Sequence, residues 1–268
     1  MLLGPEYFGL QLSLDELLFL FQVGRMSFSR RSGIAGTEGW IAPEMMLGNR
    51  STTCAVDIFS LGCVYYFVLS DGSHPFGESF KRQANILTNE CNLSKVSDNF
   101  VALNLIEKMI GSEPSLRPPA SAVLKHPIFW SKDKCLSFLQ DASDRVDKED
   151  SESAILASLE RNRLDIVRGN WLEILDEHVH EDLRKHRTYK GGSVRDLLRA
   201  LRNKKHHYNE LPEVTKLMYG RMPDQFTDYW TSRFPRLLIH SWMSMHCIKN
   251  EPGFIKYFDK DYDFVKVS

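Results

Sequence analysis

The sequence predicts a mainly α protein. Alternating patterns typical of strands are scarce, whereas apolar residues recur at helical spacing from about residue 54 to the end. Prolines separate the helical segments, as in "PPASAVLKHP" at 118–127. A length of 268 residues, 43% of them hydrophobic, is enough for a sizeable core and one or two domains.

Composition limits the class of protein further. The formal net charge of −1 argues against binding of nucleic acid through overall positive charge, and against a disordered tail. The five Cys are widely spaced and form no CxxC, which predicts free thiols in a reducing compartment. No apolar run approaches the roughly 18 residues that a membrane-spanning helix needs. We therefore expect no direct membrane span in this chain.

Residues 1–22 form an atypical N-terminal segment. They contain "LLFLFQ", but Glu6, Asp15 and Glu16 lie where a signal peptide carries positive charge. We therefore expect no targeting segment here. Our hypothesis is that this segment is not native to the domain that follows, and that it is translated intron.

The first half carries five short motifs in a fixed order. They are "GTEGWIAPE" at 36–44, "DIFSLGC" at 57–63, "HPF" at 74–76, "RP" at 117–118 and "HPIFW" at 126–130. Their order and spacing resemble the C-terminal lobe of a protein kinase, in which Ala-Pro-Glu closes the activation segment. The resemblance implies that Glu44 pairs with Arg117 and that Asp57 anchors its helix to the catalytic loop. We therefore expect a partial kinase C-lobe over residues 23–131.

The residues that perform phosphoryl transfer are missing. That reaction needs a glycine-rich loop, a strand Lys, a catalytic Asp, and an Asp and an Asn that hold magnesium. The sequence has no GxGxxG, no VAIK-like segment and no HRD, and Tyr7 replaces the metal-binding Asp in "YFG" at 7–9. ATP and Mg²⁺ bind the full-length family, but their binding residues are absent here. We expect no kinase activity from this chain.

A Ser/Arg segment precedes the kinase motifs. Ser27, Ser29 and Ser32 lie beside Arg30 and Arg31, and phosphates there would meet guanidinium groups that could order the segment. A solvated loop is the alternative. The kinase resemblance favours phosphorylation in trans, within a full-length protein.

A helix over residues 193–207 carries an unusual set of donors. Ser193 is a good N-cap, and Asp196 three residues later resembles a capping box. Val194, Leu197, Leu198 and Leu201 form an apolar stripe. Residues 184–205 hold nine Lys and Arg against one acid. Singly, each cation is best explained as a solvated surface residue or as a complement to the helix dipole.

Together these side chains have the chemistry to cleave RNA without a metal. An imidazole exchanges a proton near neutral pH, and an Arg binds a phosphate through two hydrogen bonds. An Asn adds a neutral donor, and the RNA supplies its own 2′-hydroxyl as nucleophile. Three histidines, His178, His180 and His186, are weak metal candidates because no Cys or fixed carboxylate accompanies them. We therefore expect no metal site.

The stretch "YKGGSVRDLLRALRNKKHHY", at 189–208, resembles a known ribonuclease domain. That domain follows the kinase in the inositol-requiring sensor of the unfolded-protein response, and it also ends the interferon-induced latent ribonuclease. The resemblance implies four catalytic residues. They are Tyr189, Arg202, Asn203 and His207.

The resemblance also implies their roles. His207 would be the general acid toward the leaving 5′-oxygen, and Tyr189 would deprotonate or position the 2′-hydroxyl. Arg202 and Asn203 would hold the phosphate, with Lys204 and Arg199 as RNA-binding residues. Tyr189 precedes the helix, about 20 Å from its far end, so Gly191 and its neighbour Gly192 must fold the chain back.

The predicted organisation is a truncated kinase C-lobe followed by an all-helical ribonuclease domain at 132–260 and a tail at 261–268. The aromatic side chains of 224–242 are expected to be core, because Phe226, Tyr229, Trp230 and Phe234 follow helical spacing. The resemblance implies cleavage of stem-loop mRNA by a homodimer or oligomer, formed with itself or with the full-length protein. In the family this occurs on the cytosolic side of the endoplasmic reticulum membrane, and this chain alone is expected to be cytosolic. An active Ser/Thr kinase and an inactive fragment that acts only through interactions are the alternatives.

Overall fold

The computed structural model describes residues 37–48 and 53–265. All regular elements in these ranges are helices, which confirms the mainly α fold class. None of them is long and apolar enough to cross a membrane. Residues 1–22 and the three candidate phosphosites Ser27, Ser29 and Ser32 lie outside the described residues.

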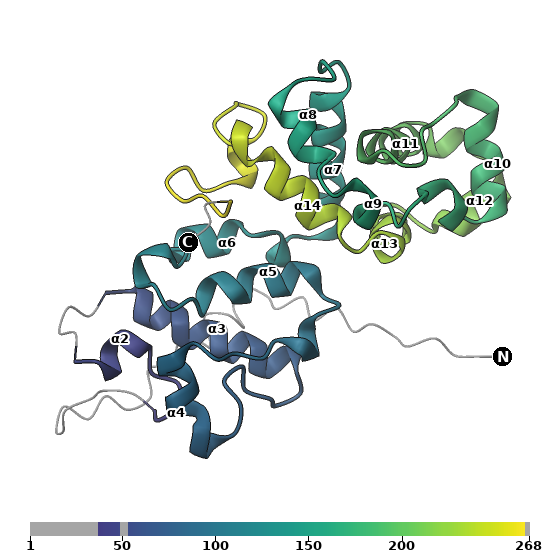
Figure 1. The fold of residues 1–268 in the computed structure, drawn as a ribbon. Coiled ribbons are helices and arrows are strands. Elements are labelled where there is room, and N and C mark those ends of the chain that lie inside the picture. The colour runs from purple at the N-terminus through teal and green to yellow at the C-terminus, as the bar shows by residue number, and fades with distance from the viewer. Residues whose placement is uncertain (1–36, 49–52, 266–268) are drawn as a thin grey trace, which may run out of the picture.

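The helices form two groups, α2 to α6 and α7 to α14 (Figure 1). The first group comprises α2 (Pro43–Met46), α3 (Ala55–Leu69), α4 (Ser79–Thr88), α5 (Phe100–Met109) and α6 (Ala120–Lys125). The second comprises α7 (Lys132–Val146), α8 (Ala154–Leu159), α9 (Arg163–Ile166), α10 (Glu177–His186), α11 (Val194–His206), α12 (Glu213–Tyr219), α13 (Asp224–Arg233) and α14 (Leu237–Ser244). Short 3₁₀ helices are η1 (Ser94–Val96), η2 (Pro114–Leu116), η3 (Pro127–Phe129), η4 (Trp171–Ile174), η5 (Tyr208–Glu210), η6 (Met245–Ile248) and η7 (Ile255–Tyr257).

Close packing of α3 on α5 forms the centre of the first group. Gly62, in the "DIFSLGC" motif, lies at this contact. A Cβ at this position would stand 2.7 Å from the Cβ of Met109 and 2.8 Å from a methyl group of Ile110. The two helices can therefore approach this closely only because residue 62 has no side chain.

A buried ion pair ties α2 to the segment before α6. Arg117 donates to both oxygens of Glu44, over 2.6 and 2.9 Å, as the kinase resemblance implies. Its Nε donates to the carbonyl of Gly111, so the buried guanidinium is well supplied with acceptors. Asp57 lies exposed in the first turn of α3, and its side-chain carboxylate makes no hydrogen bond to another described residue.

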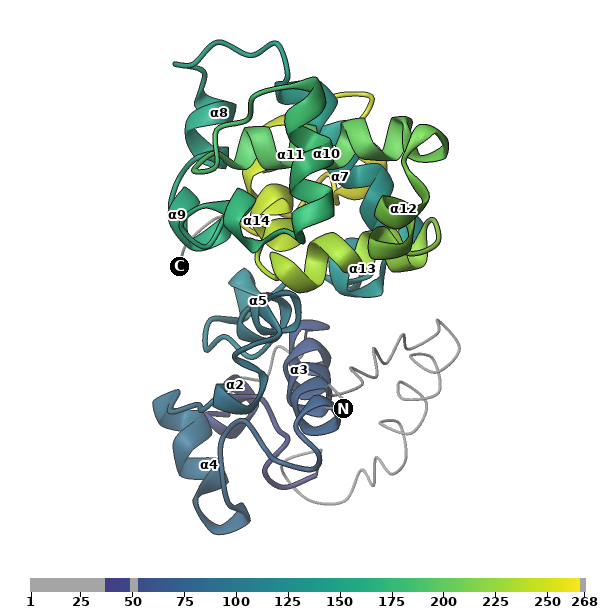
Figure 2. The same ribbon diagram turned by 90° about the vertical axis from the view of Figure 1, so that its right-hand side faces the viewer.

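The second group is built around α7. Helices α11 and α13 pack against it, and α14 contacts both α8 and, from the first group, α5. Figure 2 shows α5 lying directly under α13 and α14. The aromatic residues expected in the core are confirmed there. Phe226, Trp230 and Phe234 are completely buried and Tyr229 is 5% exposed, with the helices broken at Pro235.

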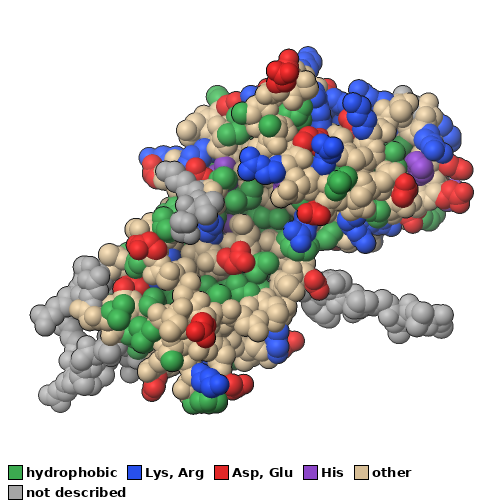
Figure 3. Space-filling view, in the orientation of Figure 1, with side chains coloured by type: hydrophobic (Ala, Val, Ile, Leu, Met, Phe, Trp, Pro, Cys, Tyr) green, Lys and Arg blue, Asp and Glu red, His purple; other side chains and the backbone are tan. Residues whose placement is uncertain are grey.

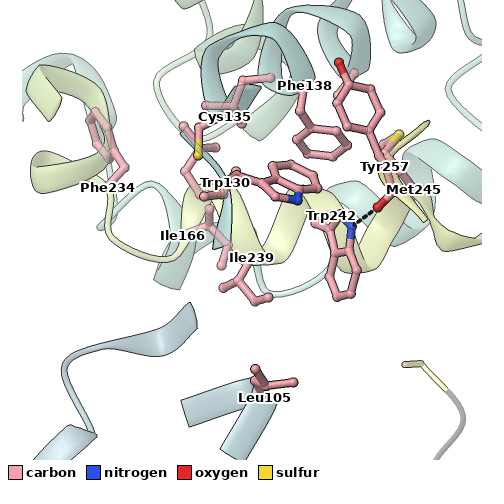
Figure 4. Packing of buried hydrophobic residues seen from close by; sticks show 14 of the residues in the cluster. Leu105, Trp130, Cys135, Phe138, Ile166, Phe234, Ile239, Trp242, Met245 and Tyr257 are labelled. Atoms are coloured by element: carbon pink, nitrogen blue, oxygen red, sulfur yellow. Dashed lines mark hydrogen bonds between the residues drawn. The ribbon is translucent and has the colours of Figure 1, made fainter. Parts of the chain in front are cut away.

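An aromatic cluster joins the two groups. Trp130, Phe138 and Tyr257 pack on one another, and the indole of Trp242 donates to the carbonyl of Tyr257 over 3.2 Å (Figure 4). The ring of His126, from the first group, stands edge-on to Trp242 at 4.9 Å. These rings are large apolar surfaces from both groups, so their burial stabilises one fixed arrangement.

The segment expected to be a tail extends this cluster. Phe264 is 2% exposed and lies 4.9 Å from Trp242 and 5.3 Å from His126, measured between ring centroids. The hydroxyl of Tyr262 donates to the carbonyl of Leu116 over 2.6 Å. Residues 261–265 therefore contact both groups of helices, which an independent tail would not do.

Candidate active site

Helix α11 follows the predicted pattern. Its N-cap is Ser193, whose hydroxyl accepts a hydrogen bond from the backbone of Asp196 over 3.2 Å. The apolar stripe is completely buried, as predicted, and packs against α7. It consists of Val194, Leu197, Leu198 and Leu201. The helix therefore has one face fixed in the core and a polar flank on the other side.

The expected capping box is only half present. In a capping box the side chain three residues after the N-cap bonds the backbone N–H of the N-cap itself. Here Oδ2 of Asp196 accepts from the backbone N–H of Lys190 instead, over 2.7 Å. The helix N-terminus is capped from α8: Glu160 accepts from the Ser193 hydroxyl and from the backbone of Arg195, over 2.7 and 3.0 Å.

The loop before α11 folds back along the helix, as the pair of glycines had to allow. Trp171 holds it, because its indole donates to the carbonyl of Lys190 over 3.1 Å and its backbone N–H to that of Gly191 over 3.0 Å. A Cβ at Gly191 would lie 1.7 Å from Oδ1 of Asn170, so a larger residue would displace that amide from its hydrogen bond with the backbone of Leu172. Tyr189 is thereby buried against Trp171, with ring centroids 5.7 Å apart.

Three of the four predicted catalytic side chains meet through hydrogen bonds. The amide nitrogen of Asn203 donates to the hydroxyl of Tyr189 over 3.1 Å. The amide oxygen of Asn203 accepts from Nε and Nη2 of Arg202, over 3.3 and 3.2 Å. Nη1 of Arg202 donates to Asp144 over 2.9 Å. Asn203 therefore links a phenol to a guanidinium in one continuous cluster.

His207, the fourth, lies one turn beyond Asn203 at the C-terminal end of α11. Its backbone N–H donates to the carbonyl of Asn203 over 3.0 Å, and its imidazole is 63% exposed. Nδ1 is 2.9 Å from a carboxylate oxygen of Glu210. A carboxylate on Nδ1 favours the tautomer with the proton on that nitrogen, which leaves Nε2 for exchange with a ligand.

Lys204 is placed differently from the sequence prediction. It is 6% exposed and forms an ion pair with Asp182 of α10, which is 4% exposed. An ammonium group enclosed in this way cannot contact an RNA backbone. The signal was present in the sequence, because position 204 continues the apolar stripe three residues after Leu201.

Arg199 is also occupied by acids of the protein. Its Nε lies 2.6 Å from Asp147 and its Nη1 3.0 Å from Asp196, and its side chain is 12% exposed. Local sequence could not reveal this, since Asp147 is 52 residues away. The acidic segment at the end of α7 supplies the carboxylates that the basic flank of α11 lacks, namely those of Asp144 and Asp147.

No group of three or more His, Cys, Asp or Glu side chains able to hold a metal occurs in the ranges 37–48 and 53–265. Figure 3 shows Lys and Arg side chains gathered on the half formed by α7 to α14. The cluster places guanidinium and amide groups, which can donate to an anion, beside the hydroxyl of Tyr189 and one turn from the imidazole of His207.

Comparison with known proteins identifies both halves of the chain. The protein kinase domain family matches residues 23–129, and the family described as Ribonuclease 2-5A matches residues 135–258. The human serine/threonine-protein kinase/endoribonuclease IRE2 is 49% identical over 267 residues, which is 96% of this chain and 29% of that protein.

Similar relatives occur in other eukaryotes. The Caenorhabditis elegans serine/threonine-protein kinase/endoribonuclease ire-1 is 49% identical over 90% of this chain and 25% of its own length. The Schizosaccharomyces pombe protein named sensor for unfolded proteins in the ER ire1 is 38% identical over 84% of this chain and 23% of its own length. The chain thus spans about a quarter of the length of these relatives. With a kinase segment and a ribonuclease domain in the same order, it belongs to the family of serine/threonine-protein kinase/endoribonucleases.

Proposed function

We propose that this chain is a metal-independent endoribonuclease whose site is formed by Tyr189, Arg202, Asn203 and His207. The observation that carries the proposal is the hydrogen-bonded row from Tyr189 through Asn203 to Arg202, with the exposed imidazole of His207 one turn further along α11. This arrangement offers donors for a phosphate and an acid that can protonate a leaving oxygen.

The proposed reaction breaks one P–O bond and forms another within the RNA. The 2′-oxygen attacks the adjacent phosphorus, and the bond from phosphorus to the 5′-oxygen breaks. His207 donates a proton to that 5′-oxygen. Tyr189 positions the 2′-hydroxyl, whose proton passes to a water molecule as the new bond forms. The products are a 2′,3′-cyclic phosphate and a 5′-hydroxyl. The proposed reaction requires no metal or cofactor.

Arg202 and Asn203 would hold the scissile phosphate. The contact of Arg202 with Asp144 lies at the surface, since the Asp144 side chain is 47% exposed. A phosphate oxygen can replace this carboxylate on Nη1 at small cost, because exposed ion pairs are weak. Phosphate binding and release of Asp144 are therefore expected to be coupled.

The names of the relatives, together with the family resemblance, support a proposal for the substrate and the setting. Two of them are named kinase/endoribonucleases and one is named a sensor for unfolded proteins in the ER. We therefore propose stem-loop mRNA of the unfolded-protein response as substrate, a homodimer as the active assembly, and the cytosolic face of the endoplasmic reticulum as the location. The kinase lobe would support assembly without binding ATP or Mg²⁺ through its own motifs.

An inactive fragment that acts only through interactions is the second candidate, because Arg202 already has the carboxylates of Asp144 and Asp147 within reach. Cleavage of a fluorogenic RNA stem-loop in EDTA separates the two. The 268-residue chain is fused to an inducible dimeriser, and wild type is compared with His207→Ala and with His206→Ala as a matched control.

The proposal predicts cleavage by wild type and by His206→Ala, with the rate of His207→Ala lower by about 10²- to 10⁴-fold. Circular dichroism checks that all three proteins keep their helix content. Absence of cleavage by a helical, dimerised wild type would favour the inactive fragment.

A further inference from the structure

Asp196 connects the loop that carries Tyr189 to the body of α11. Asp196 is 8% exposed, and each oxygen of its carboxylate accepts a hydrogen bond. Oδ2 accepts from the backbone N–H of Lys190 over 2.7 Å, and Oδ1 accepts from Nη1 of Arg199 over 3.0 Å. The residue next to Tyr189 is therefore bonded directly to the helix on which Asn203 lies.

These bonds are part of a closed ring. From Asp196 the ring passes to Arg199, and from Nε of Arg199 to Asp147 over 2.6 Å. Asp147 lies 3.6 Å from Nη1 of Arg202, and Nη2 of the same guanidinium donates to the amide oxygen of the next residue along the chain. That neighbour, Asn203, donates to the Tyr189 hydroxyl, which brings the ring back to the loop.

Asp196 is not needed as a cap of α11. Its own backbone N–H is bonded by the Ser193 hydroxyl, and Glu160 accepts from the backbone N–H of Val194 and of Arg195. The free N–H groups of a helix start are the usual reason for an acid in the first turn. Because other side chains satisfy them here, the Asp196 carboxylate is left to hold the loop.

We propose that Asp196 is a positioning residue for RNA cleavage, and the proposal rests on the ribonuclease function proposed above. It fixes the backbone of Lys190 and so sets the Tyr189 hydroxyl at Asn203. It does not touch the RNA, because its carboxylate is enclosed between the loop and Arg199. Arg199, expected from the sequence to bind RNA, orients Asp196 and connects it to Asp147.

A double-mutant cycle tests this role in the dimerised 268-residue chain. Asp196→Ala is expected to lower kcat by about 10- to 100-fold, the effect of a misplaced reacting group, with KM within about twofold. In a Tyr189→Phe background the same substitution is expected to change kcat less than about twofold, since the hydroxyl that it positions is gone.

Glu160→Gln is the matched control, because Glu160 also binds the start of α11 but does not contact the Tyr189 loop. Its effect on kcat is expected to be equal in both backgrounds. An equal effect of Asp196→Ala in both backgrounds would overturn the proposal. If Asp196→Ala does not fold, Asp196→Leu serves in the same cycle, because it removes both acceptor oxygens while keeping the branched shape of the side chain.

Hydrogen exchange gives a readout that does not depend on RNA cleavage. The Lys190 amide is expected to exchange at least about tenfold faster in Asp196→Ala or Asp196→Leu, while the amide of Leu139 in α7 is unchanged. Unchanged exchange at Lys190 would overturn the positioning role even if wild type cleaves RNA. Faster exchange in a chain that cleaves no RNA would support the contact and reject the ribonuclease function.

Discussion

The buried pair of Lys204 and Asp182 allows the sharpest test of the structure. Lys204→Met keeps the length and the apolar stem of the side chain and removes only the charge. The Asp182 carboxylate then stays in a site where its residue is 4% exposed, without its partner. Breaking a buried pair in this way costs about 3–5 kcal/mol. For a chain of this size, the melting temperature should fall by about 6–20 °C.

Urea unfolding followed by far-ultraviolet circular dichroism at neutral pH measures this loss. Lys216→Met is the matched control, because its partner Glu213 is 84% exposed and such pairs contribute little. Its free energy of unfolding should change by less than about 1 kcal/mol. Adding Asp182→Leu to Lys204→Met should recover most of the loss, since an apolar pair can replace a buried ion pair. Wild-type stability of Lys204→Met, together with weaker RNA binding, would refute the placement of Lys204 in the core.

Three further substitutions follow from the packing. Gly191→Ala should lower the free energy of unfolding by about 1–3 kcal/mol, because its methyl group would overlap the neighbouring amide, whereas Gly192→Ala, with open space to 4.0 Å, should not. Phe264→Ala should cost about 3–5 kcal/mol in the same urea assay and Val265→Ala, at 44% exposure, almost nothing. Burial lowers the pKa of His126 from 6.5 to about 3. As the pH falls, this imidazole is therefore protonated in the unfolded chain before it is protonated in the folded chain. The contribution of this imidazole to the free energy of unfolding should be fully present above pH 6.5. It should be lost as the pH falls toward 3, by up to about 1.4 kcal/mol per pH unit. His126→Gln should reduce that slope, and an unchanged slope would contradict a buried neutral imidazole.

Local patterns were sufficient for most of the fold. The stripe of α11 and the proline-bounded helices depend on spacing within a few residues, and a single sequence contains that information. The segment around Phe264 could not be placed in this way. Its aromatic residues have no helical period, and their partners, His126 and Trp242, lie far away in the sequence.

The candidate site also has a part that the sequence predicts and a part that it does not. Family resemblance supplied Tyr189, Arg202, Asn203 and His207, and the fold brings the first three into hydrogen-bond contact. The carboxylates beside Arg202 could not be predicted, because Asp144 and Asp147 lie at the end of α7 and no local pattern connects them to α11. Lys204 is the exception. Its place on the apolar stripe predicts burial, and a buried Lys requires an acid partner.

The excess of cations in residues 184–205 therefore does not measure the charge that an RNA would meet. Arg195 donates to the carbonyls of Asp147 and Glu149, Lys204 to Asp182, and Lys205 to Gln140. Arg199 is enclosed by carboxylates as well. Within α11, Arg202 is left as the cation whose acid partner is exposed enough to be exchanged for a phosphate. Each neutralised phosphate adds about 0.7 to the salt dependence of binding to a single strand. Arg202 alone should therefore contribute a slope of about 0.7, whereas all the Lys and Arg side chains of α11 together would contribute about 3.5. In this basic helix, Arg202 is therefore the cation that remains for a phosphate, and the other Lys and Arg side chains hold α11 to its neighbours.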